Sequence, residues 1–250
     1  MDTNTANTVQ YRFAPPDGYS RLPVDTGSFG YWLRGLPLQT EGAPVRLFDG
    51  REKQRQDVHA AVLKIDVGTH DLQQCADAVI RLRAEYLYAD GVYDRISFNF
   101  TSGDTASFRD WIDGMRPTVN GNHVTWCQSA SVDSSYRTFR AYLATVFMYA
   151  GSYSLNKQLK VVTDPHDIVS GDVLIEGGFP GHAVIVIDAA ENRITGERVF
   201  LLAQSYMPAQ DIHILKNPRD SVLSPWYNCD FGEVLVTPEW TFTRDQLKRF

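Results

Sequence analysis

The stretch GDVLIEGGFPGHAVIVIDAAENRITGERVFLLAQ, residues 171–204, predicts three consecutive antiparallel strands. Apolar runs cover residues 172–176, 182–188 and 199–204. A glycine-rich turn separates the first two runs, and a polar segment at 189–198 separates the last two. Short apolar runs bounded by turn-forming residues are typical of buried strands. We therefore expect a three-stranded meander at 171–204.

Helices are expected upstream of this meander. Asp71 is a suitable N-cap with Gln74 three positions later, and apolar residues recur at helical spacing up to Gly91. A second long helix is expected at about 134–149, and shorter ones at 29–34, capped by Ser28, and 107–115. Residues 58–67 predict a strand, and Asn120-Gly121-Asn122 predicts a hairpin turn. The chain shows neither repeats nor a linker, so we expect one α+β domain over 1–250.

Composition and charge narrow the function classes. The 250 residues are 43% hydrophobic and 22% charged, which is typical of a globular protein. The net charge of −6 disfavours nucleic acid and anionic membranes as partners. Five apolar residues at 183–187 are far too few to span a bilayer. Residues 1–10 are polar and carry no signal-peptide pattern. The compartment stays open between a cytoplasmic protein and an exported one without its leader.

The cysteines and histidines do not form a metal-binding pattern. The three cysteines, Cys75, Cys127 and Cys229, are irregularly spaced and contain no CxxC pair. The histidines show no HExxH motif, and the Gly177-Gly178 pair precedes no helix. We expect no metal and no cofactor, and at least one free thiol.

Cys75 and His182 are the candidate nucleophile and base. Cys75 falls in the first turn of the expected helix, where free backbone N–H groups and the helix dipole favour a thiolate. We therefore expect a lowered pKa and the highest reactivity of the three thiols. His182 opens a strand directly after the glycine-rich turn, a rigid position suited to a general base.

Gln204 is the candidate third member. A hairpin centred near Ile194 pairs residues whose numbers sum to about 386–388, so His182 would face residues near 204–206. The Gln204 amide oxygen would then accept the imidazole N–H and fix its tautomer. Asp188 is a rival on the same strand face, but six residues of strand span about 20 Å. His213 is either a spare base or without a role.

The segments Gly171-Asp172-Val173-Leu174-Ile175 and Gly181-His182-Ala183-Val184-Ile185-Val186 resemble the signature of the NlpC-type cell-wall peptidases and the CHAP amidases. These are papain-like enzymes with a Cys–His pair. The resemblance covers 71–89 and 171–204 as a catalytic core and makes about 92–165 an inserted helical segment. The sequence departs from the pattern around the thiol, Gln74-Cys75-Ala76-Asp77, and in having Gln as the third residue.

Over nearly its full length the chain resembles the bacterial DUF4846 family. The segments that carry this resemblance are 73–78, 81–86, 180–184, 202–210 and Thr237-Pro238-Glu239-Trp240. The family implies no activity.

Three functions remain open. The first is a cysteine hydrolase or acyl-transfer enzyme acting on an amide bond, with a peptide or cell-wall fragment as substrate. It would use Cys75, His182 and Gln204. The oxyanion or the substrate would be bound by the Cys75 backbone N–H and by residues from the set Gln73, Gln74, Gly181, Ser205 and Tyr206. The second is a non-catalytic module that binds peptide or glycan. The third is a structural protein with Cys75 in its core.

Overall fold

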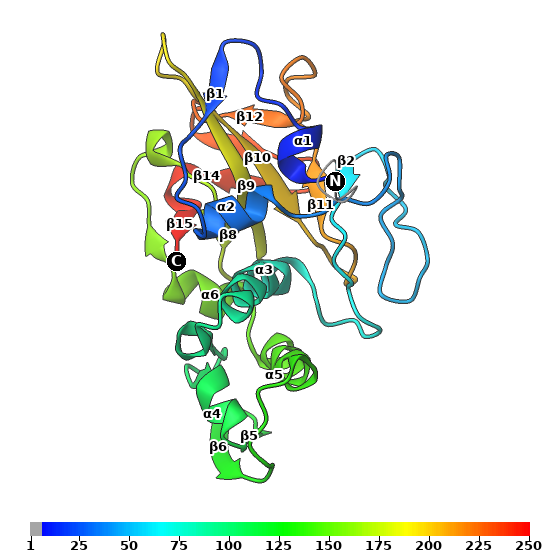
Figure 1. The fold of residues 1–250 in the computed structure, drawn as a ribbon, viewed down its shortest axis with the longest axis vertical. Coiled ribbons are helices and arrows are strands. Elements are labelled where there is room, and N and C mark those ends of the chain that lie inside the picture. Colours follow the sequence, from blue (N-terminus) through cyan, green and yellow to red (C-terminus); the bar gives the residue numbers. More distant parts are fainter. Residues whose placement is uncertain (1–6) are drawn as a thin grey trace.

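The computed structural model describes residues 7–250, so the first six residues of the polar stretch at 1–10 lie outside it. A mostly antiparallel sheet forms the upper part of the molecule (Figure 1). The strand order is β2-β11-β10-β9-β8-β15-β7, with β1 paired to β9 and β12 to β10. The coarse α+β class is confirmed by this mixture of helices and mostly antiparallel strands.

The bounds of the elements are as follows. The helices are α1 (Val9–Arg12), α2 (Phe29–Arg34), α3 (Cys75–Ala89), α4 (Phe108–Ile112), α5 (Tyr136–Tyr149) and α6 (Ser152–Gln158), with 3-10 turns η1 (Tyr93–Arg95), η2 (Pro165–Asp167) and η3 (Arg244–Gln246). The strands are β1 (Tyr19–Arg21), β2 (His59–Val62), β3 (Ser97–Asn99), β4 (Thr105–Ser107), β5 (Met115–Asn120), β6 (His123–Gln128), β7 (Lys160–Val161), β8 (Val173–Glu176), β9 (His182–Asn192), β10 (Arg198–Gln204), β11 (His213–Leu215), β12 (Trp226–Asn228), β13 (Val234–Val236), β14 (Thr241–Thr243) and β15 (Leu247–Arg249).

The predicted meander is confirmed. Strands β8, β9 and β10 pair antiparallel in chain order, with Ile175 opposite Ala183 and Ala203 opposite Ile185. The ladder between β9 and β10 has an irregularity between Leu201 and Leu202. Apolar residues on these strands are buried, as expected for short strands covered on both faces.

The start of α3 differs from the expectation that Asp71 caps it. The helix begins at Cys75, and its N-cap is Gln74, whose backbone N–H donates to Asp77 at 3.1 Å. Asp71 instead accepts the backbone N–H of Ala209 at 2.7 Å, a contact with a distant loop. Since Asp71, Gln74 and Asp77 are spaced by three, two capping boxes overlap, and the tertiary contact favours the second. Cys75 is therefore the first helical residue.

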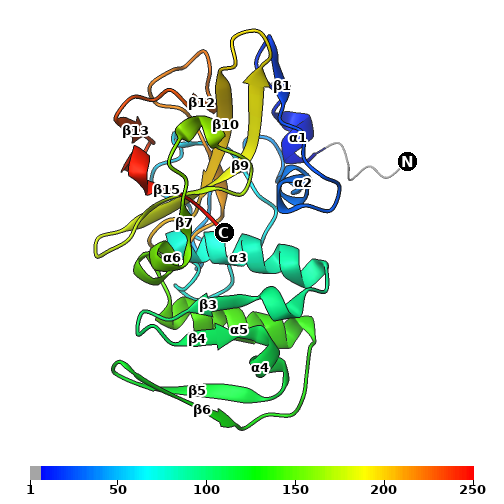
Figure 2. The same ribbon diagram turned by 90° about the vertical axis from the view of Figure 1, so that its left-hand side faces the viewer.

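The resemblance implied a helical insertion at 92–165, but this segment is not purely helical. It contains the hairpins β3–β4 and β5–β6 beside α4, α5 and α6, and forms the lower part of the molecule (Figure 2). The β5–β6 turn has Gly121 at φ +60°, as the Asn-Gly signal indicates. Helix α3 lies between this part and the sheet (Figures 1 and 2). Residues of α3, α5 and β9 belong to one hydrophobic core.

Two shorter elements complete the comparison. Ser28 caps α2, accepting the Tyr31 backbone N–H at 3.2 Å, as predicted. The strand predicted at 58–67 is limited to β2, because after Val62 the chain leaves the ladder and forms only an isolated bridge between Leu63 and Leu38.

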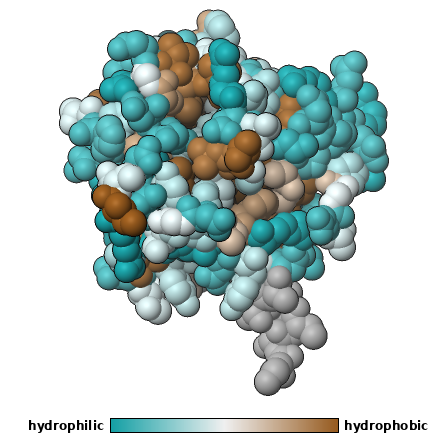
Figure 3. All heavy atoms as spheres, turned by 90° about the horizontal axis from the view of Figure 1, so that it is seen from above, coloured by the Kyte–Doolittle hydropathy of each residue, from teal (hydrophilic) through white to brown (hydrophobic). Residues whose placement is uncertain are grey.

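Seen from above, the surface is mostly hydrophilic with separate apolar patches (Figure 3). In residues 7–250 no helix combines the length and apolar character of a membrane span.

Candidate functional site

His182 is the first residue of β9 and its side chain is almost fully buried, with 1% exposed. Its Nε2 lies 2.9 Å from Oε1 of Gln204 on β10. The predicted contact between these two side chains is therefore confirmed. Because an amide oxygen only accepts, Nε2 carries the proton and Nδ1 has the lone pair.

The turn before His182 is so closely packed that Gly181 has no room for a side chain. A Cβ at this position would lie 2.3 Å from Ser152 Oγ, 2.6 Å from the Gly178 carbonyl oxygen and 2.7 Å from that of Glu176. Contacts this short require glycine. Gly181 thus fixes the approach of the chain to His182, and the structure gives it this packing role.

Aromatic rings enclose the imidazole. The ring centroids of Tyr206, Trp240 and Phe242 lie 4.9, 5.3 and 6.0 Å from that of His182. Burial lowers the pKa of His182 to about 4, and the hydrogen bond that His182 donates to Gln204 only partly opposes this. His182 is therefore neutral at physiological pH.

Cys75 corrects one expectation from the sequence. Its side chain is 7% exposed, and burial, together with the nearby Asp77, raises the pKa of the thiol to about 11. The backbone amides of Ala76 and Ala183 act in the opposite direction but do not overcome burial. The expected lowering of the pKa is wrong, because desolvation outweighs the helix terminus. Cys75 is therefore a neutral thiol, and it contacts the backbone amide of Ala183, the residue after His182.

The two candidate partners do not form a hydrogen bond. Among residues 7–250, no hydrogen bond joins Cys75 to His182, and none reaches His182 Nδ1. The Tyr206 ring is tilted against the imidazole of His182, and burial, Glu239 and Cys75 all raise the pKa of its phenol. Tyr206 is partly buried.

The remaining predicted residues have structural partners. The Gln73 side-chain oxygen accepts from Arg81 at 2.9 Å, and its buried Nε2 has no partner within residues 7–250, so this nitrogen stays a candidate donor. The Gln74 backbone N–H is used by Asp77, as described above. Ser205 is fully buried, and its Oγ lies 2.8 Å from the Gln210 carbonyl oxygen. Of the proposed donors, the structure leaves the Cys75 backbone N–H and Gln73 Nε2 as candidates.

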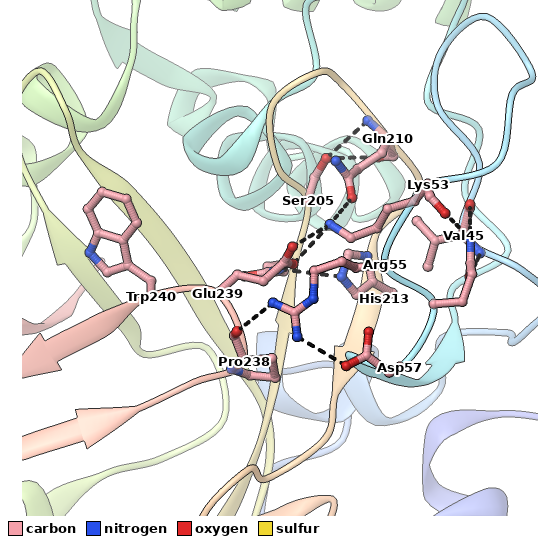
Figure 4. Close-up of polar contacts among 12 residues, drawn as sticks. Val45, Lys53, Arg55, Asp57, Ser205, Gln210, His213, Pro238, Glu239 and Trp240 are labelled. Atoms are coloured by element: carbon pink, nitrogen blue, oxygen red, sulfur yellow. Dashed lines mark hydrogen bonds and ion pairs between the residues drawn. The ribbon is translucent and has the colours of Figure 1, made fainter.

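Sequence reasoning missed two charged residues, Lys53 and Glu239 (Figure 4). Gln204 Nε2 donates to Glu239 at 2.7 Å, and Lys53 Nζ lies 2.8 Å from the same carboxylate. Lys53 Nζ also donates to Gln210 at 2.8 Å. Both charged side chains are about nine-tenths buried. Glu239 stood within a segment that carried the family resemblance, but the sequence contained no sign that it meets Lys53.

An open cavity of about 590 Å³ adjoins this cluster. It is lined by Glu239 and Trp240, both in contact with the His182–Gln204 pair, and by Arg55, Glu176, Thr237, Pro238 and Thr241. Arg55 donates to the Pro238 carbonyl oxygen at 3.0 Å and to Asp57 at 3.1 Å (Figure 4).

A second cavity, of about 610 Å³, lies between α2 and α3. It is lined partly by Asp66, Arg81, Glu85 and Tyr136. Arg81 is 2% exposed and donates to Glu85 at 2.6 Å, and Tyr136 donates to the same carboxylate at 2.7 Å. These polar groups satisfy one another, which is typical of a structural network.

Asp188, the rival partner for His182, lies elsewhere. It is fully buried and binds Arg21 at 2.6 Å and Arg34 at 2.5 Å. His213, the spare histidine, is also fully buried, and its Nε2 lies 3.4 Å from Gln204 Nε2. No group of three potential metal ligands occurs within residues 7–250.

Comparisons with known proteins give one match. No curated protein and no solved structure matches the chain. The papain-like core therefore stays a prediction. The model of a family described as "Domain of unknown function (4846)" matches residues 9–249, which is nearly the whole chain and includes Cys75, His182, Gln204 and Glu239. The chain belongs to the DUF4846 family.

Proposed function

We propose that this protein is a cysteine hydrolase or acyl-transfer enzyme that acts on an amide bond. The observation that carries the proposal is the arrangement around His182: its ring is held by Gln204 at 2.9 Å, and the next residue, Ala183, presents its backbone amide to the Cys75 thiol. A thiol at a helix start, an imidazole at a strand start and an orienting amide on the neighbouring strand are the parts that nucleophilic catalysis requires.

The reaction starts from two neutral groups. As Cys75 Sγ attacks the carbonyl carbon, its proton moves to His182 Nδ1 and the carbonyl π electrons move to oxygen. The Cys75 backbone N–H stabilises that oxyanion. When the tetrahedral intermediate collapses, the C–N bond breaks and His182 returns the proton to the leaving nitrogen. The resulting thioester is then cleaved by water or by an acceptor amine.

Access requires a movement of Tyr206. The Cys75 and His182 side chains are 7% and 1% exposed, and the partly buried Tyr206 lies beside both. In the proposed enzyme, substrate enters from the cavity beside Trp240 and displaces this ring. Closure afterwards excludes water from the neutral pair, which strengthens the electrostatic interactions with the oxyanion.

The substrate class follows from the resemblance noted in the sequence. The NlpC-type peptidases and CHAP amidases act on peptides of the cell wall, so a peptide or cell-wall peptide is the proposed substrate. The proposed core consists of α3 and the β8–β9–β10 meander. The parts from 92 to 165 are an insertion in this scheme.

Labelling with a thiol-reactive peptide amide, such as a peptidyl chloromethylamide, tests the proposal. The experiment uses a Cys127→Ser background, because Cys127 is exposed and would react first. We expect labelling at Cys75, a loss of at least tenfold in His182→Ala, and faster labelling in Tyr206→Ala than in the matched Tyr206→Phe. Labelling that is equal with and without His182 contradicts an enzyme.

A binding module is the second candidate, and the aromatic wall favours it. Trp240 lies beside His182 and lines an open cavity of about 590 Å³, and the partly exposed Tyr206 lies on the same imidazole. Aromatic side chains on such a wall stack well on peptide or sugar rings. Calorimetric binding of a peptide or glycan that is lost in Trp240→Ala, without any labelling of Cys75, would select this function.

A further inference from the structure

We propose that Glu239 is a positioning residue that locks the Gln204 amide in one orientation, and that this amide in turn fixes the tautomer of His182. The geometry of the lock stands on its own; its meaning for catalysis rests on the function proposed above. The lock consists of Lys53, Glu239, Gln204 and His213, of which Gln204 contacts the His182 ring.

The first half of the lock is the ion pair. Lys53 Nζ lies 2.8 Å from one Glu239 oxygen and 2.9 Å from the other, and both side chains are buried. A carboxylate that pairs with an ammonium group accepts hydrogen bonds and donates none. Glu239 lies 2.7 Å from Gln204 Nε2, so this end of the amide must be its nitrogen.

The second half comes from His213. Its Nδ1 lies 2.8 Å from the Asp211 carbonyl oxygen, so Nδ1 carries the proton and Nε2 has a free lone pair. That lone pair is 3.4 Å from Gln204 Nε2. The amide nitrogen has two hydrogens and meets two acceptors, a carboxylate and an imidazole nitrogen. A flipped amide would place its oxygen against both acceptors, which is repulsive.

The consequence reaches His182 through the other end of the amide. With its nitrogen held by Glu239 and His213, Gln204 presents only oxygen to His182, and Nε2 of that ring must donate. His182 Nδ1 is then the unprotonated nitrogen, the one able to accept a proton from a thiol. The lock thus keeps two neighbouring histidines in opposite tautomers: Nε2–H in His182 and Nδ1–H in His213.

Long-range ¹H–¹⁵N correlation spectra of histidine-labelled full-length protein at pH 7.5 read the tautomers directly. The chain has six histidines, so the spectrum is tractable, and His182→Gln and His213→Gln samples assign the signals. We expect a pyrrole-type Nε2 and a pyridine-type Nδ1 for His182, and the reverse for His213. The opposite tautomer at either histidine overturns the proposal.

The variant that breaks the lock replaces both charges, Lys53→Met with Glu239→Leu, because removing one alone would leave a buried unpaired charge. The amide then loses its strongest acceptor and can turn. We expect the His182 Nδ1 signal to move toward the pyrrole-type position as both tautomers become populated. The matched control is Glu176→Gln, whose carboxylate accepts from the Trp240 indole at 3.0 Å in the same wall but does not touch Gln204.

The result separates this proposal from the enzyme proposal. A shifted His182 tautomer in the double variant, with wild-type signals in the control, supports the lock whether or not Cys75 reacts with a peptide amide. Wild-type tautomers in a folded double variant show that Glu239 does not position the amide and overturn the lock, even if Cys75 is labelled.

Discussion

Two positions on β9 bury a titratable side chain in opposite ways. In the second half of the strand Asp188, with 0% exposed, binds the guanidinium groups of Arg21 and Arg34. At the first residue of the strand His182, with 1% exposed, is neutral and is held by the uncharged amide of Gln204. The irregularity of the β9–β10 ladder lies between them: Val186 pairs with Leu202 of one hydrophobic cluster, whereas Asp188 pairs with Leu201 of the other. The expectation that Asp188 shares a strand face with His182 is therefore wrong, because the bulge reverses the alternation.

The difference separates a structural cluster from a candidate site. Both Asp188 oxygens accept from arginines, which tie β1 and α2 to the sheet. Near His182 the charged groups are Glu239 and Lys53, which form hydrogen bonds or ion pairs with Gln204 and with each other but not with the imidazole. Within residues 7–250 no hydrogen bond reaches Nδ1 of His182. A neutral imidazole whose unprotonated nitrogen is not used in a hydrogen bond is available to accept a proton, as reactive sites require.

The largest effect is expected at the Asp188 end. Asp188→Asn leaves two arginines without their counter-charge and should lower the free energy of unfolding by about 3–5 kcal/mol. Urea denaturation measures it. Glu191→Gln on the same strand is the control, because its partner Arg198 is partly exposed and the pair is worth about 1 kcal/mol or less. Equal losses of unfolding free energy in the two variants would contradict the structural role given to Asp188.

The next effect is acid destabilisation at the His182 end. Burial lowers the pKa of His182 from 6.5 to about 4 and that of His213 to about 3. The unfolded chain then binds more protons than the folded one as the pH falls below 6.5, so stability is lost in that direction. Each histidine should lower the free energy of unfolding by about 1.6 kcal/mol between pH 6.5 and pH 5.

Urea titrations of the wild type and of His182→Phe over this pH range isolate the contribution of His182. Raised pKa values of buried carboxyl groups such as Asp77 act in the opposite sense but are common to both proteins. The stability of the variant should fall less steeply toward pH 5. Parallel curves would show that His182 is not kept neutral by the fold.

A smaller effect is expected from Gly181→Ala. The new Cβ would overlap Ser152 Oγ and two carbonyl oxygens at 2.3–2.7 Å, and overpacking of this kind costs about 1–3 kcal/mol. Gly178→Ala is the control, because its Cβ would meet a single carbonyl oxygen at the longer distance of 3.2 Å. Thermal denaturation compares the two, and a more stable Gly181→Ala protein would contradict the close packing before His182.

The smallest effect concerns the thiol. Because the pKa of Cys75 is raised to about 11 and no ion pair joins it to His182, iodoacetamide should modify exposed Cys127 first. In Cys127→Ser, the rate at Cys75 should rise with pH well above 9. His182→Phe, which keeps the site apolar, should leave that midpoint unchanged. A midpoint below 8.5 that rises in His182→Phe would reveal a thiolate–imidazolium pair.

The meander and the His182–Gln204 contact were predictable from the sequence. Three apolar runs with their turns set both the strand order and the register, because in a hairpin the turn position fixes which residues oppose. Local signals of this kind depend only on neighbouring residues. The N-cap of α2 and the hairpin turn at Gly121 were predictable for the same reason.

The errors have a common cause in tertiary contacts. Position at a helix start is visible in the sequence, but the burial that raises the pKa of Cys75 is not. Ala209 captures Asp71 and moves the start of α3. The partners Lys53 and Glu239 are 186 residues apart, so no spacing rule connects them.

That separation also determines when the surroundings of His182 are completed. The Lys53–Glu239 contact closes across most of the chain, and β15, the last strand, pairs with β8 next to β9. Contacts between such distant parts are entropically expensive and form slowly. During synthesis the meander therefore emerges before Glu239, which follows Gln204 by 35 residues. The surroundings of His182 are completed only once the segment that contains Glu239 has been made.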